Sequence, residues 1–331
     1  AMKSMRVETP TFFVDDELKY ISSTPSNGCF ITYNSAAGDT RANAILVDSD
    51  GSIIGESIRL STVEQDQFIK GLVKTDLGFF VIWEDQRFGS ADIYGQFVSF
   101  DGDLLGPQDG IPITIAANDQ LKPSITYNGI LNEIMVCWED FRNGLDYDIY
   151  CASINASTFE VSEIDLCIYS SNQKAPFVYA TLDGSYLFAW EDSRGSQTSN
   201  IYYQSMSGEN FNYATNGIVL CDADFNQFTP KINLYNEDSN SYITFWDDMR
   251  SSGKEDLTNI YVQSITVEDT SECTLLDVNN DGLINVIDVV QTVNIVLGTP
   301  PTTWESCAAD GNLDGVINVI DIVLLVNYIL S

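Results

Sequence analysis

The sequence predicts an all-β domain followed by a small all-α domain at the C-terminus. The first observation is a tryptophan-centred unit, in which Trp83, Trp138, Trp190 and Trp246 recur at intervals of 55, 52 and 56 residues. The second is an acidic loop that occurs twice near the C-terminus, 33 residues apart, and each copy precedes an apolar stretch. A chain of 331 residues is also too long for one simple core, which favours two domains.

The repeat in the larger part of the chain is seen around the tryptophans, in WEDQRFGSADIYGQ, WEDFRNGLDYDIYCA, WEDSRGSQTSNIYYQ and WDDMRSSGKEDLTNIYVQ. Upstream of each tryptophan stands a glutamine, followed in the last three units by a proline at the third residue: Gln67, Gln120, Gln173, Gln227, Pro123, Pro176, Pro230. A degenerate copy of the repeat, FITYNSAAGDTRANAILV, precedes them and has Tyr33 at the tryptophan position. The chain therefore carries five units.

Each unit reads as four short strands. In the second full copy these are PSITYN, EIMVCW, DIYCASI and EIDLCIY, which are alternating or apolar and are separated by polar turns. Four strands in a repeat of about 52 residues are typical of a β-propeller blade, whose faces are buried only against neighbouring blades. We expect residues 1–267 to form a five-bladed β-propeller. The repeat resembles those of large secreted bacterial and archaeal proteins with predicted propeller domains.

The two ends of this repeat array predict how the ring closes. The fifth unit ends after its third strand, near Val267, and the N-terminal TPTFFVDDE aligns with the missing fourth strand. Residues 11–14 are therefore expected to complete the last blade, which removes an exposed sheet edge.

The tryptophan is followed by an acidic pair and an arginine, at Asp85/Arg87, Asp140/Arg142, Asp192/Arg194 and Asp248/Arg250. In the structural interpretation, the tryptophan packs between blades while the aspartate and arginine tie the next turn by charge-assisted hydrogen bonds. In the functional interpretation, the acidic and aromatic groups of the motif form a ring on one face of the propeller and bind sugar. Because active sites break symmetry and this motif preserves it, the structural interpretation is favoured.

The acidic loops are DVNNDGLINVID, Asp277 to Asp288, and DGNLDGVINVID, Asp310 to Asp321. Each has oxygen-bearing side chains at positions 1, 3, 5 and 12 and glycine at position 6, which is the EF-hand arrangement for calcium. Helices are expected at about 286–297 and 319–330. A duplicated unit of a calcium loop followed by one helix resembles a type I dockerin. Dockerins are small modules that attach an extracellular protein to its partner by binding a cohesin domain.

This resemblance implies two Ca²⁺ ions. The first takes side chains of Asp277, Asn279, Asp281 and Asp288 with the Leu283 carbonyl, and the second takes Asp310, Asn312, Asp314 and Asp321 with the Val316 carbonyl. It also implies that loop positions 10 and 11 face the cohesin: Val286, Ile287, Val319, Ile320. These pairs could equally dock on a sister extracellular protein or on the propeller of the same chain. Two structural calcium sites without a docking role are the alternative.

The seven cysteines include no CxxC pair, so a zinc site is not expected. Cys273 and Cys307 stand just before the two acidic loops, where a disulfide would stabilise the module by ~2–4 kcal/mol if unstrained. Cys137 and Cys151 flank one hairpin and could also meet across strands. The absence of histidine excludes Ser-His catalysis and histidine metal sites.

Composition limits the partners. The net charge is −33, from 48 acidic and 15 basic residues, which argues against nucleic acid or an anionic membrane surface. No segment is predicted to insert in a membrane, and the polar AMKSMRVETP is expected to begin a trimmed or recombinant mature chain. The expected organisation is a propeller (1–267), a linker (268–274) and a dockerin-like module (275–331).

The leading functional prediction is an extracellular or cell-surface protein without catalytic activity. Its propeller presents a surface for a ligand, which could be a glycan, and the dockerin tethers it to a cohesin. The alternatives are a dockerin-borne glycoside hydrolase, like the five-bladed arabinanases that use two or three carboxylates in a funnel, and a subunit of an extracellular assembly. Because no acidic pair departs from the repeat, no catalytic residue is assigned.

Overall fold

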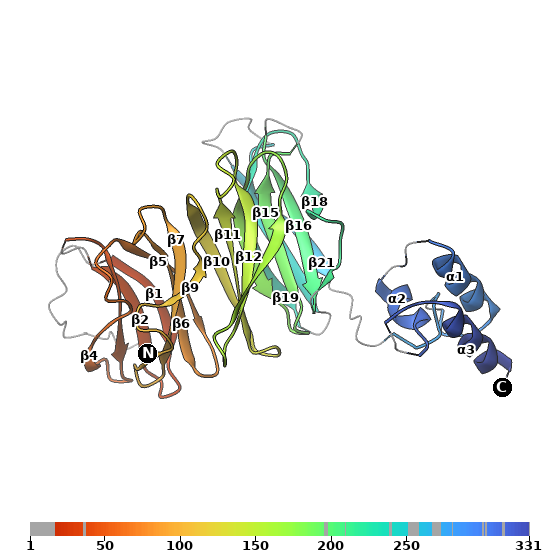
Figure 1. The fold of residues 1–331 in the computed structure, drawn as a ribbon, viewed down its shortest axis with the longest axis horizontal. Coiled ribbons are helices and arrows are strands. Elements are labelled where there is room, and N and C mark those ends of the chain that lie inside the picture. The colour runs from red at the N-terminus through yellow and green to blue at the C-terminus, as the bar shows by residue number, and fades with distance from the viewer. Residues whose placement is uncertain are drawn as a thin grey trace. The chain divides into compact units, whose positions relative to one another are not determined.

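The computed structural model describes residues 17–35, 38–194, 198–208, 210–237, 240–250, 258–266, 273–279, 281–299, 301, 303–312 and 315–330. The chain divides into two compact units, Ala1–Ile265 and Thr266–Ser331. The first is built of strands and the second of helices, so the predicted all-β fold class with a small helical C-terminal part is confirmed (Figure 1).

The first unit contains five antiparallel sheets, one for each sequence unit. The first sheet is β1 (Glu17–Ser23), β2 (Cys29–Ser35), β3 (Arg41–Val47) and β4 (Ile53–Arg59). The second is β5 (Gln67–Lys74), β6 (Gly78–Asp85), β7 (Asp92–Ser99), β8 (Leu104–Leu105) and β9 (Ile111–Thr114). The third is β10 (Gln120–Asn128), β11 (Glu133–Asp140), β12 (Asp148–Asn155) and β13 (Val161–Cys167).

The fourth sheet is β14 (Gln173–Ala180), β15 (Tyr186–Asp192), β16 (Asn200–Ser207), β17 (Asn210–Phe211) and β18 (Ile218–Cys221). The fifth is β19 (Gln227–Asn236), β20 (Ser241–Asp248) and β21 (Asn259–Thr266). The expected strand that would complete this sheet, residues 11–14, lies outside the described residues. Within the described part of the chain the sheets remain separate hydrogen-bonded units, so a closed ring of five blades stays a prediction.

Consecutive sheets pack face to face, which explains the apolar runs in their second strands. In β6, the alternate residues Phe79 and Trp83 join a core with the first sheet. Phe80 and Ile82, which point to the opposite face, join a core with Trp138 and other residues of the third sheet. All residues of β6 are consequently buried, and the strand reads as a continuous apolar run rather than an alternating one.

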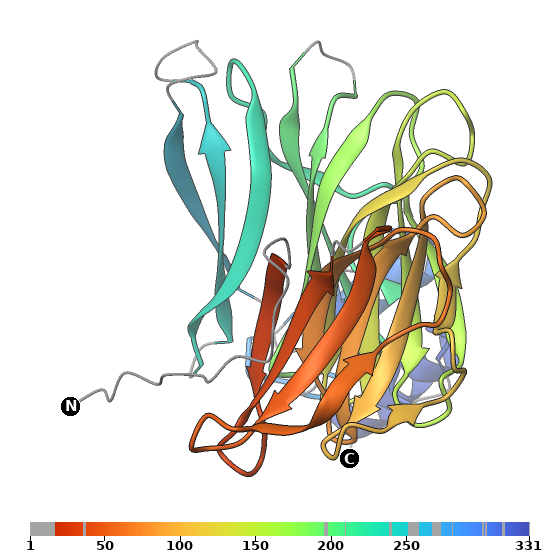
Figure 2. The ribbon, with the colours of Figure 1, turned by 90° about the vertical axis from the view of Figure 1, so that its left-hand side faces the viewer.

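The first strand of each sheet lies beside the first strand of the next. Contacts join β1 to β5, β5 to β10, β10 to β14, and β14 to β19. The five sheets follow one another in chain order (Figure 2). The first strands thus gather on one side of their sheets, where they line a common cavity described below.

The second unit contains α1 (Val286–Val296), α2 (Thr303–Ala309) and α3 (Val319–Leu330). Asn285 caps α1 by accepting from the backbone N–H of Ile287 and forms a capping box with Asp288. The small core is centred on the buried residues Val278, Ala308 and Ala309. Helix α2 was not predicted; it carries part of this core, and the indole of Trp304 donates to the Asp277 carbonyl at 2.9 Å. No described helix is long and apolar enough to cross a membrane.

Candidate functional site

The first acidic loop wraps its backbone around two buried carboxylates. Asp288 is fully buried, and its carboxylate accepts from the backbone N–H of Asn279 at 3.0 Å and of Asn285 at 2.8 Å. Asp277 is 1% exposed and accepts from the N–H of Gly282 at 2.9 Å. Gly282 has φ +80°, a conformation that a side chain would strain, which explains the glycine at loop position 6.

The second loop repeats this geometry. The buried Asp321 accepts from the backbone N–H of Asn312 at 3.3 Å and of Asn318 at 2.8 Å. Asp310 accepts from the N–H of Gly315 at 2.8 Å, and Gly315 has φ +83°. The predicted ligand Asp314 lies outside the described residues. Leu283 and Val316, predicted to contribute carbonyls, accept from the side chains of Asn285 and Asn318.

The donor set of these loops fits calcium. Three of the carboxylates, those of Asp277, Asp288 and Asp321, are at most 1% exposed, and no described lysine or arginine forms an ion pair with them. Residues 266–331 contain no lysine, arginine or histidine at all. Burying like charges without a counter-ion is costly, so a cation from solution would offset it. Hard carboxylate and carbonyl oxygens suit Ca²⁺.

The predicted docking pairs stand at the starts of α1 and α3. Val286, Ile287, Val319 and Ile320 are between 53% and 67% exposed. Each pair follows directly after an N-cap asparagine, Asn285 or Asn318, whose side chain accepts from the helix backbone. The two apolar surfaces are therefore equivalent in sequence and in local structure. The structure also joins Cys273 to Cys307 and Cys137 to Cys151 by disulfides.

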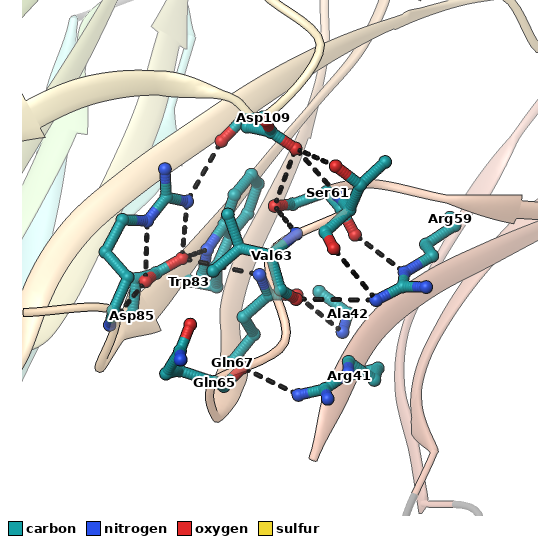
Figure 3. Close-up of polar contacts among 12 residues, drawn as sticks. Arg41, Ala42, Arg59, Ser61, Val63, Gln65, Gln67, Trp83, Asp85 and Asp109 are labelled. Atoms are coloured by element: carbon teal, nitrogen blue, oxygen red, sulfur yellow. Dashed lines mark hydrogen bonds and ion pairs between the residues drawn. The ribbon is translucent and has the colours of Figure 1, made fainter. Parts of the chain in front are cut away.

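The tryptophan motif of the sheets forms a hydrogen-bonded cluster (Figure 3). Asp85, which is fully buried, accepts from the Trp83 indole at 2.7 Å and pairs with the Arg87 guanidinium at 2.7 Å. Arg87 in turn lies 3.7 Å from the centroid of the Tyr94 ring and donates to the Asp109 carbonyl at 3.0 Å. The same indole–carboxylate bond recurs at Trp138, Trp190 and Trp246, with lengths of 2.7 to 3.0 Å. These contacts lie within single sheets, which supports the structural interpretation.

A second buried aspartate follows the motif in two sheets. Burial, and then the charge of Asp85, raises the pKa of Asp92 from 3.8 to about 6. Burial, and then the charge of Asp146, raises the pKa of Asp148 to about 6. The folded protein therefore holds these protons more tightly than the unfolded chain does. The stability that results is present below the unfolded pKa and is lost as the pH rises through about 6.

We expect the Tm of the sheet unit to fall between pH 5 and pH 7, and the fall to be smaller in Asp92→Asn, whose side chain stays neutral. Thermal melts followed by circular dichroism at both pH values measure it. Asp101→Asn, an exposed position in the same sheet, is the control and should retain the wild-type pH dependence. An identical fall in Asp92→Asn and wild type would contradict the assignment.

In three of the four motifs, the acidic residue before the motif aspartate links consecutive sheets. Glu84 accepts from the backbone N–H of Lys122 at 2.8 Å, and Glu139 accepts from that of Ala175 at 2.8 Å. Glu191 accepts from the N–H of Thr229, also at 2.8 Å. The three residues that donate have φ between 46° and 51°, at points where the strand register shifts. Each carboxylate thus holds a kink in the first strand of the next sheet.

These kinks lie beside a cavity of about 550 Å³, which we call the central cavity. It is lined by residues of the first strands of all five sheets, including Tyr20, Lys70, Lys122, Phe177 and Lys231. None of the lining residues was predicted from the sequence as a site residue, although Pro123 and Pro176 stand out in the repeat. A signal existed, since four of the eight lysines follow a repeat glutamine by one to four residues: Lys70, Lys122, Lys174, Lys231.

Two carboxylates behind the cavity wall have different environments. The Glu139 carboxylate lies 3.1 Å from the Lys122 ammonium. Burial raises the pKa of Glu191, and the charge of Glu139 raises it further, against the lowering effect of the hydrogen bond from Thr229. Ala175 and Thr229, whose backbones donate to these carboxylates, both line the cavity. Glu139 is thus paired with a cation, whereas the pKa of Glu191 is raised.

Comparison with known proteins identifies the C-terminal unit. Residues 275–330 match the model of the dockerin type I domain, so the chain ends in such a domain. No curated protein matches the chain. Dockerin domains bind calcium and have cohesins as partners, and the proteins that carry them are typically extracellular or on the cell surface.

Among solved structures, the α-L-arabinanase of Penicillium chrysogenum is 13% identical, with 75% of this chain and 76% of that chain covered and a TM-score of 0.42. The endo-arabinase of Bacteroides thetaiotaomicron is 14% identical, with 77% and 94% covered and a TM-score of 0.40. A thermostable family-43 glycoside hydrolase is 12% identical, with 79% and 93% covered and a TM-score of 0.41.

These comparisons correct the leading functional prediction. The non-enzymatic binding protein was wrong as the first choice, because the similar structures are arabinanases and glycoside hydrolases, the class named as the alternative. Such distant likenesses assign no activity to this chain. A hydrolase function must therefore be argued from its own residues.

Proposed function

We propose that this protein is a glycoside hydrolase carried by a dockerin, which attaches it through calcium to a cohesin-bearing partner outside the cell. The observation that carries the attachment is the dockerin type I domain at residues 275–330, with its two acidic loops. Five blades of a propeller, with residues 11–14 completing the last, are the arrangement we propose for the catalytic part.

The docking surface we propose consists of Val286, Ile287, Val319 and Ile320. Their exposure supports this, since adjacent exposed β-branched residues on a soluble unit are typical of an interaction surface. Calcium held by Asp277 to Asp288 and by Asp310 to Asp321 would fix the entry to each helix. Because the two pairs are equivalent, the cohesin could be bound in either of two orientations.

Hydrolysis is proposed at the central cavity, with Glu191 as the proton donor and Glu139 as the second carboxylate, both of which lie behind its wall beside the lining residues Thr229 and Ala175. Glycoside hydrolysis uses two carboxyl groups that flank the scissile bond, since one protonates the leaving oxygen while the other acts as nucleophile or base. The raised pKa of Glu191 and the ion pair of Glu139 with Lys122 support this division of roles. Thr229 and Ala175, which hold the two carboxylates, border the cavity where a sugar would lie.

The full chain, with calcium, is expected to release reducing ends from at least one polysaccharide in a panel of plant and algal cell-wall polymers. Glu191→Gln should lower kcat by about 10²–10⁴-fold, the usual contribution of a general acid. The glutamine oxygen still accepts from Thr229 N, so the strand kink is preserved. Glu56→Gln, an exposed position on β4, is the control and should keep full activity. Absence of product from every polymer would refute the hydrolase.

Attachment is tested separately. Immobilised cohesins are expected to retain the chain in calcium and release it in chelator, and Val286→Asp/Val319→Asp should abolish retention. A chain that no cohesin retains would refute tethering without affecting the hydrolase.

A further inference from the structure

Three lysines gather at the central cavity of this acidic chain. The chain carries a net charge of −33, yet Lys70, Lys122 and Lys231 from three different sheets line this one cavity. No aspartate or glutamate is among the described residues that line it. Any lysine among them whose charge is not neutralised by a protein carboxylate would favour an anionic ligand, which the remaining acidic surface repels.

The positions of the lysines break the repeat. Lys122 is the second residue after its repeat glutamine, Lys70 is the third and Lys231 is the fourth. At the fourth position the other full units have Gly71, Ser124 and Phe177. Residues that the full units share for folding recur in all four of them, as the tryptophan and its aspartate do. The lysines are therefore not required by the repeat architecture.

One of these lysines has no anionic partner. Lys70 pairs with Glu84 at 3.0 Å and Lys122 pairs with Glu139 at 3.1 Å. Lys231 forms no ion pair within the described part of the chain, and its ammonium lies 4.6 Å from the centroid of the Phe177 ring. Lys231 remains accessible from the cavity, although the surrounding protein lowers its pKa by desolvation. Its charge is available for a ligand.

The rest of the lining suits a sugar. The Phe177 ring and the neighbouring Pro123 and Pro176 supply apolar surface of the kind on which a pyranose face packs. The Ser124 hydroxyl accepts from the N–H of Val178 at 3.2 Å, which leaves its proton for a ligand oxygen. A volume of about 550 Å³ is in the range of small-molecule sites.

We propose that the central cavity binds a carboxylated oligosaccharide, a short uronic-acid oligomer, with a carboxylate on the Lys231 ammonium. This proposal rests on the proposed function in that it names the substrate class of the same cavity. A charge-assisted bond to Lys231 distinguishes acidic from neutral sugars, while Phe177 and Ser124 distinguish a sugar from a simple anion.

Calorimetry on the calcium-loaded full chain tests it, with trimers of galacturonate, glucuronate and mannuronate as probes. At least one is expected to bind, and its methyl ester, which has the same rings without charge, should bind at least tenfold more weakly. Lys231→Met should weaken binding of the acid at least tenfold, whereas Lys231→Arg should retain most of it. Lys74→Met, on β5 but outside the cavity lining, is the control and should bind as the wild type does. Thermal melts establish that the variants are folded.

The proposal is overturned if none of the three acids binds, if acid and ester bind equally, or if Lys231→Met has no effect. Equal binding of inorganic sulfate at the same site would show a simple anion site and would also overturn it. Binding of the acid without hydrolysis contradicts only the hydrolase. Hydrolysis of a neutral polymer, without acid binding, contradicts only this inference.

Discussion

Removal of calcium is expected to unfold residues 275–330 while the sheet unit stays folded. The core of this small domain is centred on three buried residues, Val278, Ala308 and Ala309, which is little apolar area for an independent fold. No lysine or arginine in the described part of the chain pairs with its buried carboxylates, so their repulsion opposes folding once the ion is gone. Metal binding and folding of the domain should therefore be coupled.

The measurement is a calcium titration by calorimetry, combined with far-ultraviolet circular dichroism. Wild type should bind close to two ions per chain and lose helical signal in chelator. Asp277→Ala/Asp310→Ala should bind none and lack the helical signal even in calcium. At free calcium 1,000-fold above Kd, the stabilisation that is lost is about 4 kcal/mol for each site, or about 8 kcal/mol for two.

Glu305→Gln is the matched control, since it removes one charge from the same domain outside both loops and keeps an acceptor for Gln291. It should bind two ions. Helicity that persists unchanged in chelator would show that the disulfide between Cys273 and Cys307 and the small core suffice, and the calcium-dependent docking would lose its basis.

Asp85→Asn is expected to destabilise the sheet unit by ~3–5 kcal/mol, the usual cost of removing one partner from a buried ion pair. The carboxylate accepts from the Trp83 indole and from both the backbone and the guanidinium of Arg87. An amide can satisfy only part of these donors, and it leaves the Arg87 charge without its counter-ion. Arg87 in turn donates to the backbone carbonyl of Asp109. The Asp109 side chain accepts from the N–H of Thr62, in the loop before β5.

Urea denaturation followed by tryptophan fluorescence, in saturating calcium, gives this free energy of unfolding. The exposed Asp101→Asn should stay within about 0.5 kcal/mol of the wild type, as surface substitutions usually do. A similarly small effect of Asp85→Asn would mean that the motif does not stabilise the sheets, and would reopen its interpretation as a sugar-binding ring.

Local sequence patterns were enough to predict several parts of the molecule. The four strands expected in the second full unit correspond to β10–β13, since each is a short apolar run bounded by turn residues. The helices expected at 286–297 and 319–330 agree with α1 and α3 to within one residue, because their loops and caps are encoded within a dozen positions. The dockerin type I domain was identified for the same reason.

Helix α2 was missed because it has only seven residues and little amphipathic pattern of its own. It depends on the packing of Ala308 and Ala309 against Val278, about thirty residues earlier in the chain. The functional preference for a non-enzymatic protein had a related cause. It rested on the symmetry of the tryptophan motif, and symmetry within the repeat says nothing about residues that depart from it.

The sequence by itself determined the number of sheets, the two acidic loops and the helices that follow them, since each depends on residues within one repeat. Only the tertiary structure decided which side chains share the central cavity. Lys70, Lys122 and Lys231 are separated by 52 and 109 residues, and Glu84 reaches Lys122 across 38. Such distances are closed by the packing of whole sheets against one another, which buries the tryptophan faces and brings the first strands together.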